Sequence, residues 1–470
     1  MTRRYSTDPR TERSLRHAVR DGAAYSVMAG AGETYFSAYA LFLGASAAQV
    51  SLLAAVPPLF GALAQVLAAW LSLRLGRRRT VILTGALMHA LTWFPLVWLP
   101  YFFPAHAVPV MITCLIFYHG WIGLGTPLWG SLIGDLVPAQ RRGRFFAART
   151  RLMSVANLVA LVAAGLVLHL FELREDTRLG FILIFTLAAV ARLFSLHELW
   201  RMHEPDQAPG SFSLPPLSHL VPRLMASRFL HFSLFTASFS FAVAVAAPFF
   251  TVYMLKDLEF SYLQFMLSTA ATVLTQALTL RTWGRFSDVF GNRLVLLVAG
   301  ALVPLLPALW LVSDSFGYIL LVQALGGLAW AGFGLAAGNY LYDLVPPERR
   351  TAYWAGHNVL NSAGAFGGAV LGGYLSARMP HAVYVLGAKL HWSSGLWAVL
   401  LVSAMLRGLV AASFLPRLRE VRPVPHLDAR AAAFRLIRFA PLGGLVLDLL
   451  GWGRARRRPP RLARPDTEKF

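Results

Sequence analysis

Apolar residues gather in long runs that are separated by short charged, proline-containing or glycine-containing breaks. Each run has about 20 residues, the length that an α-helix needs to cross a hydrocarbon layer about 30 Å thick. The pattern predicts an all-α, polytopic membrane protein with twelve transmembrane helices in two pseudo-symmetric six-helix bundles. The predicted spans are 22–43, 49–73, 80–100, 108–133, 152–171, 179–199, 229–254, 261–280, 294–312, 316–341, 353–376 and 392–415.

The composition agrees with a membrane protein and argues against a soluble domain. Of the 470 residues, 57% are hydrophobic and only 14% are charged, whereas soluble domains contain about 25% charged residues. A formal charge of +21 would suggest nucleic acid as the partner of a soluble protein. Because the arginines lie between the apolar runs, we expect anionic lipid headgroups at the cytoplasmic face as the partner, and no nucleic acid.

Lysine and arginine are distributed unevenly between the two sets of loops. Thirty-six of the 43 lie in the N-terminal segment, the C-terminal tail and alternate loops, and five lie in the opposite loops. Basic loops stay on the cytoplasmic side of a membrane. We therefore expect a multi-pass protein of the cell's inner (plasma) membrane with both termini in the cytoplasm.

The chain contains an internal repeat. The segment GDLVPAQRRGRFFAARTRLMS at 134–154 recurs as YDLVPPERRTAYWAGHNVLNS at 342–362, and the proline-rich stretch 201–228 divides the spans six and six. The repeat indicates two related halves. The expected organisation is a cytoplasmic N-terminal segment 1–20, a bundle 21–200, a linker 201–228, a second bundle 229–415 and a basic tail 416–470 with an interfacial helix.

The short loop after the eighth span has the pattern Gly-x-x-x-Asp-x-x-Gly-x-Arg at Gly284, Asp288, Gly291 and Arg293. Glycines allow a tight turn, Asp288 is expected to cap a helix N-terminus, and Arg293 is expected to bind helix carbonyls or a carboxylate. This loop resembles the signature loop of the major facilitator superfamily, and the resemblance extends from about residue 20 to residue 415. In the equivalent loop of the first half, Leu73 stands where the aspartate would be.

The resemblance implies a function. In this family two six-helix bundles rock about a central site and expose it to each side in turn. It implies a monomeric secondary active transporter of a small solute, powered by a proton or another cation, and not an enzyme. It also implies a cytoplasmic latch between the halves, built from the loop residues Gly284, Asp288, Gly291 and Arg293 and the repeat residues Asp135, Arg141, Arg142, Asp343, Arg349 and Arg350.

Other chemistry is not indicated by the sequence. A Gly-x-x-x-x-Gly-Lys-Ser/Thr phosphate loop is missing, which argues against ATP-driven transport. The stretch from His197 to His203 lacks the His-Glu-x-x-His spacing of a zinc site. We therefore expect no catalytic residue, no metal and no cofactor.

Glycines recur at intervals of four in two of the predicted spans. We assign Gly364, Gly368 and Gly372 to close helix packing, and we assign Gly334 and Gly338 to the same role.

Glu33 is the only acidic residue near the middle of any predicted span. A carboxylate there is costly unless a proton, a basic partner or water accompanies it. We favour a role in carrying the coupling proton or binding a cationic substrate group over a structural role. With no second midspan acid in the first half, Glu33 is expected to act without a substitute, and Tyr35 and Tyr39 are expected to line the same cavity.

Further polar residues inside the spans are weaker site candidates, because a lone histidine or amide is more often a buried hydrogen-bonding group than a ligand. His89 and Trp93 are assigned to packing, since the third span is peripheral in the superfamily. The remaining candidates for substrate or proton coupling are His119, Gln264, Gln276, Gln323, Trp330, Asn358 and Asn361.

Two alternative functions stay open. A first-span acid and an aromatic content of 13% suit a multidrug or lipid-like solute exporter, although the fifth span lacks the glycine-proline signature of that antiporter group. The degraded loop of the first half instead suits a transport-like sensor that no longer cycles. The solute, the direction of transport and the coupling ion are not indicated.

Overall fold

The structure is a computed structural model of the whole chain. It describes residues 6, 8–75, 78–138, 141–204, 228–345, 350–378, 382–385, 388–391 and 395–421, all within the compact unit that spans residues 1–423. The C-terminal tail beyond 421, with its expected interfacial helix, and most of the linker 201–228 lie outside the described residues.

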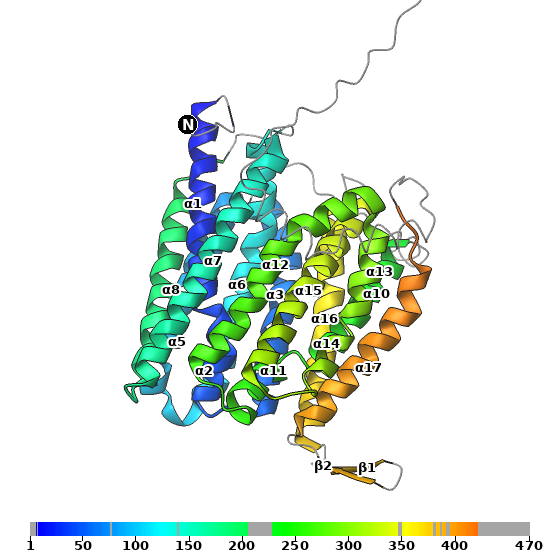
Figure 1. Cartoon of the computed structure of the whole chain (residues 1–470). Coiled ribbons are helices and arrows are strands. Elements are labelled where there is room, and N and C mark those ends of the chain that lie inside the picture. The colour runs from blue at the N-terminus through cyan, green and yellow to red at the C-terminus, as the bar shows by residue number, and fades with distance from the viewer. Residues whose placement is uncertain are drawn as a thin grey trace, which may run out of the picture. The chain divides into compact units, whose positions relative to one another are not determined.

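The first half of the described chain forms six helical segments that alternate in direction (Figure 1). The start of α1 marks the upper end of these segments in Figure 1, and β1 and β2 lie at the lower end. The segments are α1 (Pro9–Ala31) with η1 (Glu33–Tyr35) and α2 (Phe36–Phe42); α3 (Ala47–Leu75); α4 (Arg78–Leu91) with α5 (Trp93–Phe102); α6 (Ala107–Leu136), preceded by η2 (Pro104–His106); α7 (Arg142–Glu172); and α8 (Thr177–Trp200).

The second half repeats this pattern and adds a short hairpin between its last two segments, where β1 and β2 pair in antiparallel fashion. The segments are α10 (Arg228–Ala244) with α11 (Phe249–Val252) and the π-turn η4 (Tyr253–Asp257); α12 (Tyr262–Phe290); α13 (Asn292–Leu302) with α14 (Leu305–Leu309); α15 (Phe316–Leu344); α16 (Arg350–Arg378); β1 (Ala382–Val385) and β2 (Ala388–His391); and α17 (Leu396–Phe414) with η6 (Leu415–Arg417).

The twelve predicted spans are confirmed as helical segments. Ten of the described helices are long and apolar enough to cross a membrane by themselves. The first segment falls outside those ten because charged and polar residues interrupt it, and α16 falls outside because of polar residues and glycines in its interior. The first segment also begins at Pro9, well before the predicted start at residue 22.

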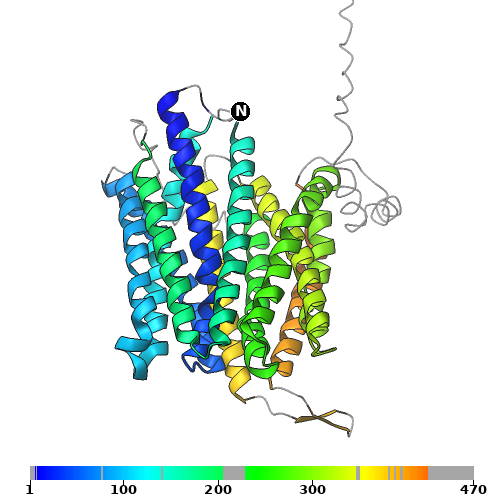
Figure 2. The same cartoon turned by 60° about the vertical axis from the view of Figure 1, so that its left-hand side comes forward.

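Equivalent helices pack in the same way in the two halves. In the first half α1 packs against α7 and α8, and α3 packs against α6; in the second half α10 packs against α16 and α17, and α12 packs against α15. Figures 1 and 2 both show the blue α1 beside α7 and α8. The two halves meet where α3 lies against α16 and α7 lies against α12.

A glycine stripe lets α16 approach α10 closely. A Cβ atom at Gly364, Gly368 or Gly372 would overlap backbone oxygens of α10 or, for Gly372, of Val245 directly after it, as expected from the sequence. The same assignment for Gly334 and Gly338 is wrong, because a Cβ at either position would meet nothing within 4 Å.

Several spans are interrupted, which the sequence pattern did not predict. The seventh is broken between Ala244 and Phe249, and the ninth is broken between Leu302 and Leu305. Prolines at positions 248 and 304 cannot donate backbone hydrogen bonds. Buried Arg407 of α17 binds both breaks, donating to the carbonyl oxygens of Val243 (3.3 Å) and Val303 (3.4 Å).

Candidate functional site

Glu33 lies at a break in the first helical segment. Gly32 ends α1, where a Cβ would overlap the Trp93 ring, and the chain continues as the 3₁₀ turn η1. The Glu33 carboxylate points into the first half, where its Oε1 accepts from the hydroxyl of Tyr118 at 2.6 Å and from that of Tyr25 at 3.4 Å. Among the described residues Glu33 forms no ion pair.

A buried arginine on α8 lies close to this carboxylate. The Arg192 guanidinium donates from Nε to His89 Nδ1 and from Nη1 to Ser195 Oγ, both at 2.7 Å. Its Cζ lies 5.5 Å from the centre of the Tyr25 ring. Assigning His89 only to packing is therefore wrong, because its ring also holds Arg192.

A second buried acid belongs to the same cluster. Asp21 is only 4% exposed, and its Oδ1 accepts from Ser195 Oγ at 2.7 Å. Its Oδ2 lies 3.8 Å from Nη2 of Arg149 on α7. The sequence indicated no second midspan acid in the first half, and Asp21 was overlooked because the predicted span began one residue after it.

These contacts form one continuous polar chain through the first half. The His89 ring packs against the Tyr118 ring, with ring centres 4.0 Å apart, and so connects the Glu33 end of the polar chain with the Arg192 end. Asp21 lies about 18 Å further up α1 than Glu33 by helix rise. In order, the chain runs through Glu33, Tyr118, His89, Arg192, Ser195, Asp21 and Arg149.

Other ionisable side chains near the polar chain have partners of their own or lie at its margin. Glu198 on α8 accepts from Nδ1 of His17 at 2.6 Å, towards the upper end. His119 follows Tyr118 on α6, with the two rings 5.5 Å apart. A buried cluster of carboxylates and guanidinium groups is stable only while its hydrogen bonds are satisfied, so a change in its protonation should move its members.

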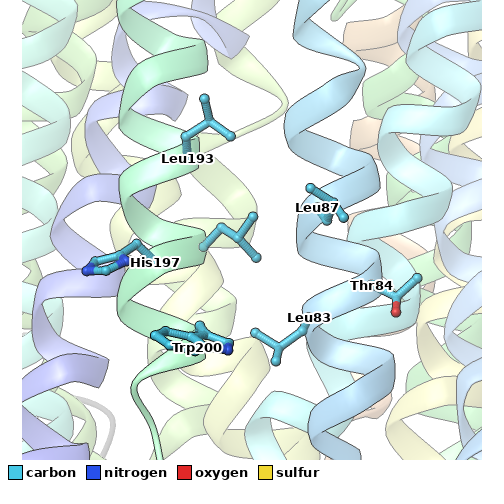
Figure 3. A pocket seen from close by; sticks show the side chains of 7 residues that line it. Leu83, Thr84, Leu87, Leu193, His197 and Trp200 are labelled. Atoms are coloured by element: carbon cyan, nitrogen blue, oxygen red, sulfur yellow. The ribbon is translucent and has the colours of Figure 1, made fainter.

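A cavity of about 250 Å³ opens beside the Asp21 end of the polar chain. Asp21, Tyr25, Arg149 and Arg192 line its polar side. The rest of its wall comes from α4, α6, α7 and the end of α8 and is mostly apolar. A larger hollow of about 430 Å³ between α4 and α8 (Figure 3) is lined mainly by leucines, with His197 as the titratable side chain in its wall.

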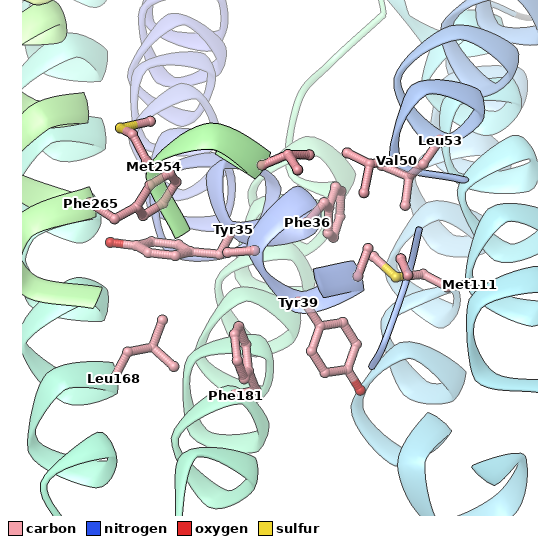
Figure 4. Close-up of a cluster of buried hydrophobic side chains, with 14 of the residues drawn as sticks. Tyr35, Phe36, Tyr39, Val50, Leu53, Met111, Leu168, Phe181, Met254 and Phe265 are labelled. Carbon is pink, nitrogen blue, oxygen red and sulfur yellow. The ribbon is translucent and has the colours of Figure 1, made fainter. Parts of the chain in front are cut away.

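Tyr35 and Tyr39 do not line the cavity as expected. Both are almost fully buried in the apolar cluster of Figure 4, and their hydroxyls donate to backbone carbonyl oxygens, to Leu161 at 2.7 Å and to Leu96 at 3.1 Å. The Tyr35 ring also contacts Phe265 of the second half, with ring centres 6.0 Å apart. Their role in the structure is packing around the break in the first segment.

The candidates on α12 and α15 are not brought to Glu33. Gln264 forms a capping box with Ser261 at the start of α12, which is a structural role. Gln276 is exposed, and the backbone carbonyl of Gln323 accepts from Thr272 at 3.0 Å. Trp330 lines a separate, mainly apolar cavity of about 330 Å³, together with Phe239 and Phe333.

The candidate amides on α16 connect helices. Asn358 Nδ2 donates to Oε1 of Gln65 on α3 at 3.0 Å, which joins the two halves. Asn361 accepts from Ser240 Oγ on α10 at 3.0 Å. These bonds indicate that Asn358 is placed to respond when the halves move, whereas Asn361 connects helices of one half.

The signature loop has the expected turn but a different set of contacts. Gly291 has φ +87°, a conformation that favours glycine. Arg293 donates from Nε to the carbonyl of Leu418, just after η6, at 2.6 Å, and it is the backbone N–H of Arg293 that donates to Glu420, at 2.8 Å. The capping role for Asp288 is wrong, because Asp288 lies in the last turn of α12 and Gly291 is the N-cap of α13.

The two repeat aspartates each accept a hydrogen bond from a side chain of their own half. Asp135 accepts from Arg78 at 2.7 Å. Asp343 accepts from Asn292 at 2.9 Å. Arg349 and the side chains of Arg142 and Arg350 lie outside the described part, so the latch itself stays a prediction.

Sequence reasoning missed two acids that hold these loops. Glu204 accepts from the backbone N–H of Arg79 at 3.3 Å, and Glu420 does the same for Arg293. Each acid follows the sixth span of its half by a few residues, and that matching position is the signal that could have revealed them.

The hydrogen bonds that the structure shows between the halves lie in the middle and at the lower end. Lys256 Nζ donates to the carbonyl of Ala45 at 2.8 Å, and the backbone N–H of Tyr262 donates to Glu172 at 3.2 Å. Ser51 Oγ donates to the carbonyl of Ala369. These bonds hold the halves together at the lower end.

Solved structures share this fold. A mutant of the nucleoside transporter NupG is 15% identical, with a TM-score of 0.63, and the match covers 86% of this chain and 100% of that one. A D-xylose-proton symporter is 15% identical (TM-score 0.64, 88% and 99% covered), and an auto-inhibited POT family peptide transporter is 12% identical (TM-score 0.67, 89% and 99% covered).

Comparisons of sequence give the family. Among curated proteins none matches the chain. The family model of the Major Facilitator Superfamily matches twice, over residues 22–246 and 230–463, so the two matches together take in both halves. The chain therefore belongs to the Major Facilitator Superfamily, as its signature loop predicted.

Proposed function

We propose that this protein is a secondary active transporter that moves a small solute by alternating access, and that Glu33 carries the coupling proton. The observation that carries the proposal is the position of one carboxylate. Glu33 lies within the first membrane segment, at its break, and two tyrosine hydroxyls hold it. Ionisable groups inside a membrane are functional candidates by default, because their cost must otherwise be offset.

The neighbourhood of Glu33 permits both protonation states. Arg192 is already hydrogen-bonded to His89 and Ser195, so protonation of Glu33 leaves no arginine without a partner. When Glu33 is ionised, the hydroxyls of Tyr118 and Tyr25 stabilise its carboxylate as donors, and Arg192 lies over the Tyr25 ring. The carboxylate can therefore gain and lose a proton without disrupting the fold.

The break that holds Glu33 also touches the second half. Tyr35 in η1 contacts Phe265, and α2 packs against α11. A change of charge at Glu33 alters its electrostatic attraction to Arg192 on α8, and this change in force acts on η1. This link supports a mechanism in which proton binding biases the packing between the halves.

The sidedness follows from the loop charges. With 36 basic residues on one side and five on the other, we place both termini in the cytoplasm and the chain in the inner (plasma) membrane. The upper end is then cytoplasmic, and hydrogen bonds between the halves at the lower end make this the state that is closed to the outside. The D-xylose-proton symporter agrees with such a function by its name but shares only the fold.

The test is transport into proteoliposomes under an imposed pH gradient, with a panel of radiolabelled small solutes. Glu33→Gln keeps the size and hydrogen bonding of the side chain but cannot titrate. Wild type should accumulate its solute against a gradient, whereas Glu33→Gln should only equilibrate it. Exposed Glu175→Gln is the matched control and should behave as wild type. Gradient-driven accumulation by Glu33→Gln would show that Glu33 is structural.

A further inference from the structure

The cavity beside the polar chain offers hydrogen-bond donors that the protein itself does not use. Arg149 donates from Nε to the carbonyl of Ala18 at 3.1 Å, and Arg192 uses Nε and Nη1. Among the described residues, Nη1 of Arg149 and Nη2 of Arg192 donate to no protein atom. Trp129 also lines the cavity, and its indole Nε1 is buried without a protein partner.

These donors are held in place by packing. The Arg149 guanidinium lies over the Trp129 ring at 4.2 Å and against Gly22, where a Cβ would come within 2.7 Å of it. Glycine at position 22 thus leaves room for the arginine, and Asp21 beside it fixes the orientation. The donors are therefore preorganised, which lowers the entropy cost of binding a ligand.

The charge and walls of the cavity select a ligand. Two arginines and one aspartate line it, which leaves one excess positive charge. Trp121, Ile122 and Met153 supply an apolar wall. A volume of about 250 Å³ is below the range of about 300–1,000 Å³ of drug-sized sites, so the ligand is small.

We propose that this cavity binds a small organic acid, with its carboxylate on Arg149, Arg192 and Trp129 and its apolar body against the α6 and α7 walls. This names the substrate class of the transporter and therefore rests on the proposed function. A proton on Glu33 and an anion in the cavity leave the polar chain with the same total charge as the empty, ionised state. The arrangement thus favours movement of proton and acid anion together.

The test is binding of three probes of similar shape to the purified full-length protein by calorimetry. Phenylacetate should bind, whereas neutral phenylacetamide and cationic phenethylamine should bind much more weakly. Trp129→Phe removes one donor without changing the charge and should weaken phenylacetate binding about tenfold, the effect of one hydrogen bond to a charged group. Trp98→Phe, at the lower end, is the matched control.

The outcome separates this proposal from the proposed coupling role. Glu33→Gln should retain phenylacetate binding while it loses proton-driven accumulation. If the three probes bind equally, or if Trp129→Phe binds phenylacetate as Trp98→Phe does, the organic-acid site is wrong even where proton coupling holds. If phenylacetate binds as expected but its transport ignores the pH gradient, the site stands and the coupling role fails.

Discussion

Two tyrosines hold Glu33 with unequal strength. The Tyr118 hydroxyl donates at 2.6 Å and the Tyr25 hydroxyl at 3.4 Å, and hydrogen bonds weaken steeply with distance. A bond to a charged group contributes about 1.5–3 kcal/mol. We therefore expect Tyr118→Phe to change the pH profile of transport far more than Tyr25→Phe, measured as initial uptake across a pH series. Equal shifts in the two variants would contradict the assignment of Tyr118 as the main donor.

Asp8 controls the start of α1 outside the membrane. The hydroxyl of Thr11 (2.6 Å), with the backbone N–H groups of Thr11 and Arg10, holds the pKa of Asp8 below its ordinary value. A lowered pKa means that the ionised cap stabilises the first turn above the ordinary value of 3.8 and that this contribution is lost as the pH falls through the lower, folded value.

Hydrogen exchange of residues 10–13 should therefore speed up in acid relative to a Leu15–Ala18 reference on the same helix. Asp8→Ala should show the fast exchange already at neutral pH. Exchange that is slow and unchanged in the variant would mean that another group caps the helix.

At this scale the sequence revealed isolated charges but not their partners. Glu33 stands out because no other acid lies in the middle of a run. Asp21 was missed because it follows Arg20 and looks like part of a solvated segment. Arg192 and His89 were visible in their spans, but their contact depends on how α8 faces α4, which a single sequence does not specify.

The glycine stripe of α16 gives a prediction for one pair of helices. A methyl group at position 368 would overlap the Phe241 carbonyl, whereas one at position 356 of the same helix meets open space. Gly368→Ala should lower the midpoint of thermal unfolding in detergent. Gly356→Ala should leave it unchanged or raise it, since alanine favours a helix by up to about 1 kcal/mol. A loss of stability in both variants alike would indicate a general cost of helix mutation and not close packing.

Helix positions were readable from the sequence, while helix breaks and caps were only partly so. Runs of apolar residues gave the twelve segments because the bilayer sets their length. The Ser261-x-x-Gln264 pattern is a capping-box signature and could have removed Gln264 from the site candidates. The breaks near prolines 248 and 304 were not predictable, because a membrane helix can also continue past a proline when neighbouring helices satisfy the freed backbone groups.

At the scale of the whole molecule, the sidedness can be tested without a solute. Single cysteines on a Cys114→Ala background should be labelled from outside at position 106 and from inside at position 210. Position 106 is at the lower end, in η2, whereas 210 lies outside the described residues. The reverse labelling pattern would overturn the topology.

The duplication was predictable from the sequence, but the contact between the halves was not. The repeated segments at 134–154 and 342–362 gave two related bundles, and the packing of equivalent helix pairs agrees with this. The bonds of Lys256 to Ala45 and of Asn358 to Gln65 belong to one state of the molecule. A sequence that must support several states does not specify one set of such contacts.

In the proposed mechanism, the protonation of Glu33 sets the relative position of the two halves. The most direct measurement uses spin labels at Arg151 of α7 and Arg281 of α12, both exposed on the upper parts of their helices, with a lower-end pair at Arg174 and Ser315. Distances are recorded across a pH series on the Cys114→Ala background. We expect the distances of the two label pairs to change in opposite directions with pH in wild type and to stay constant in Glu33→Gln. Distances that respond to pH equally in the variant and in wild type would contradict this mechanism.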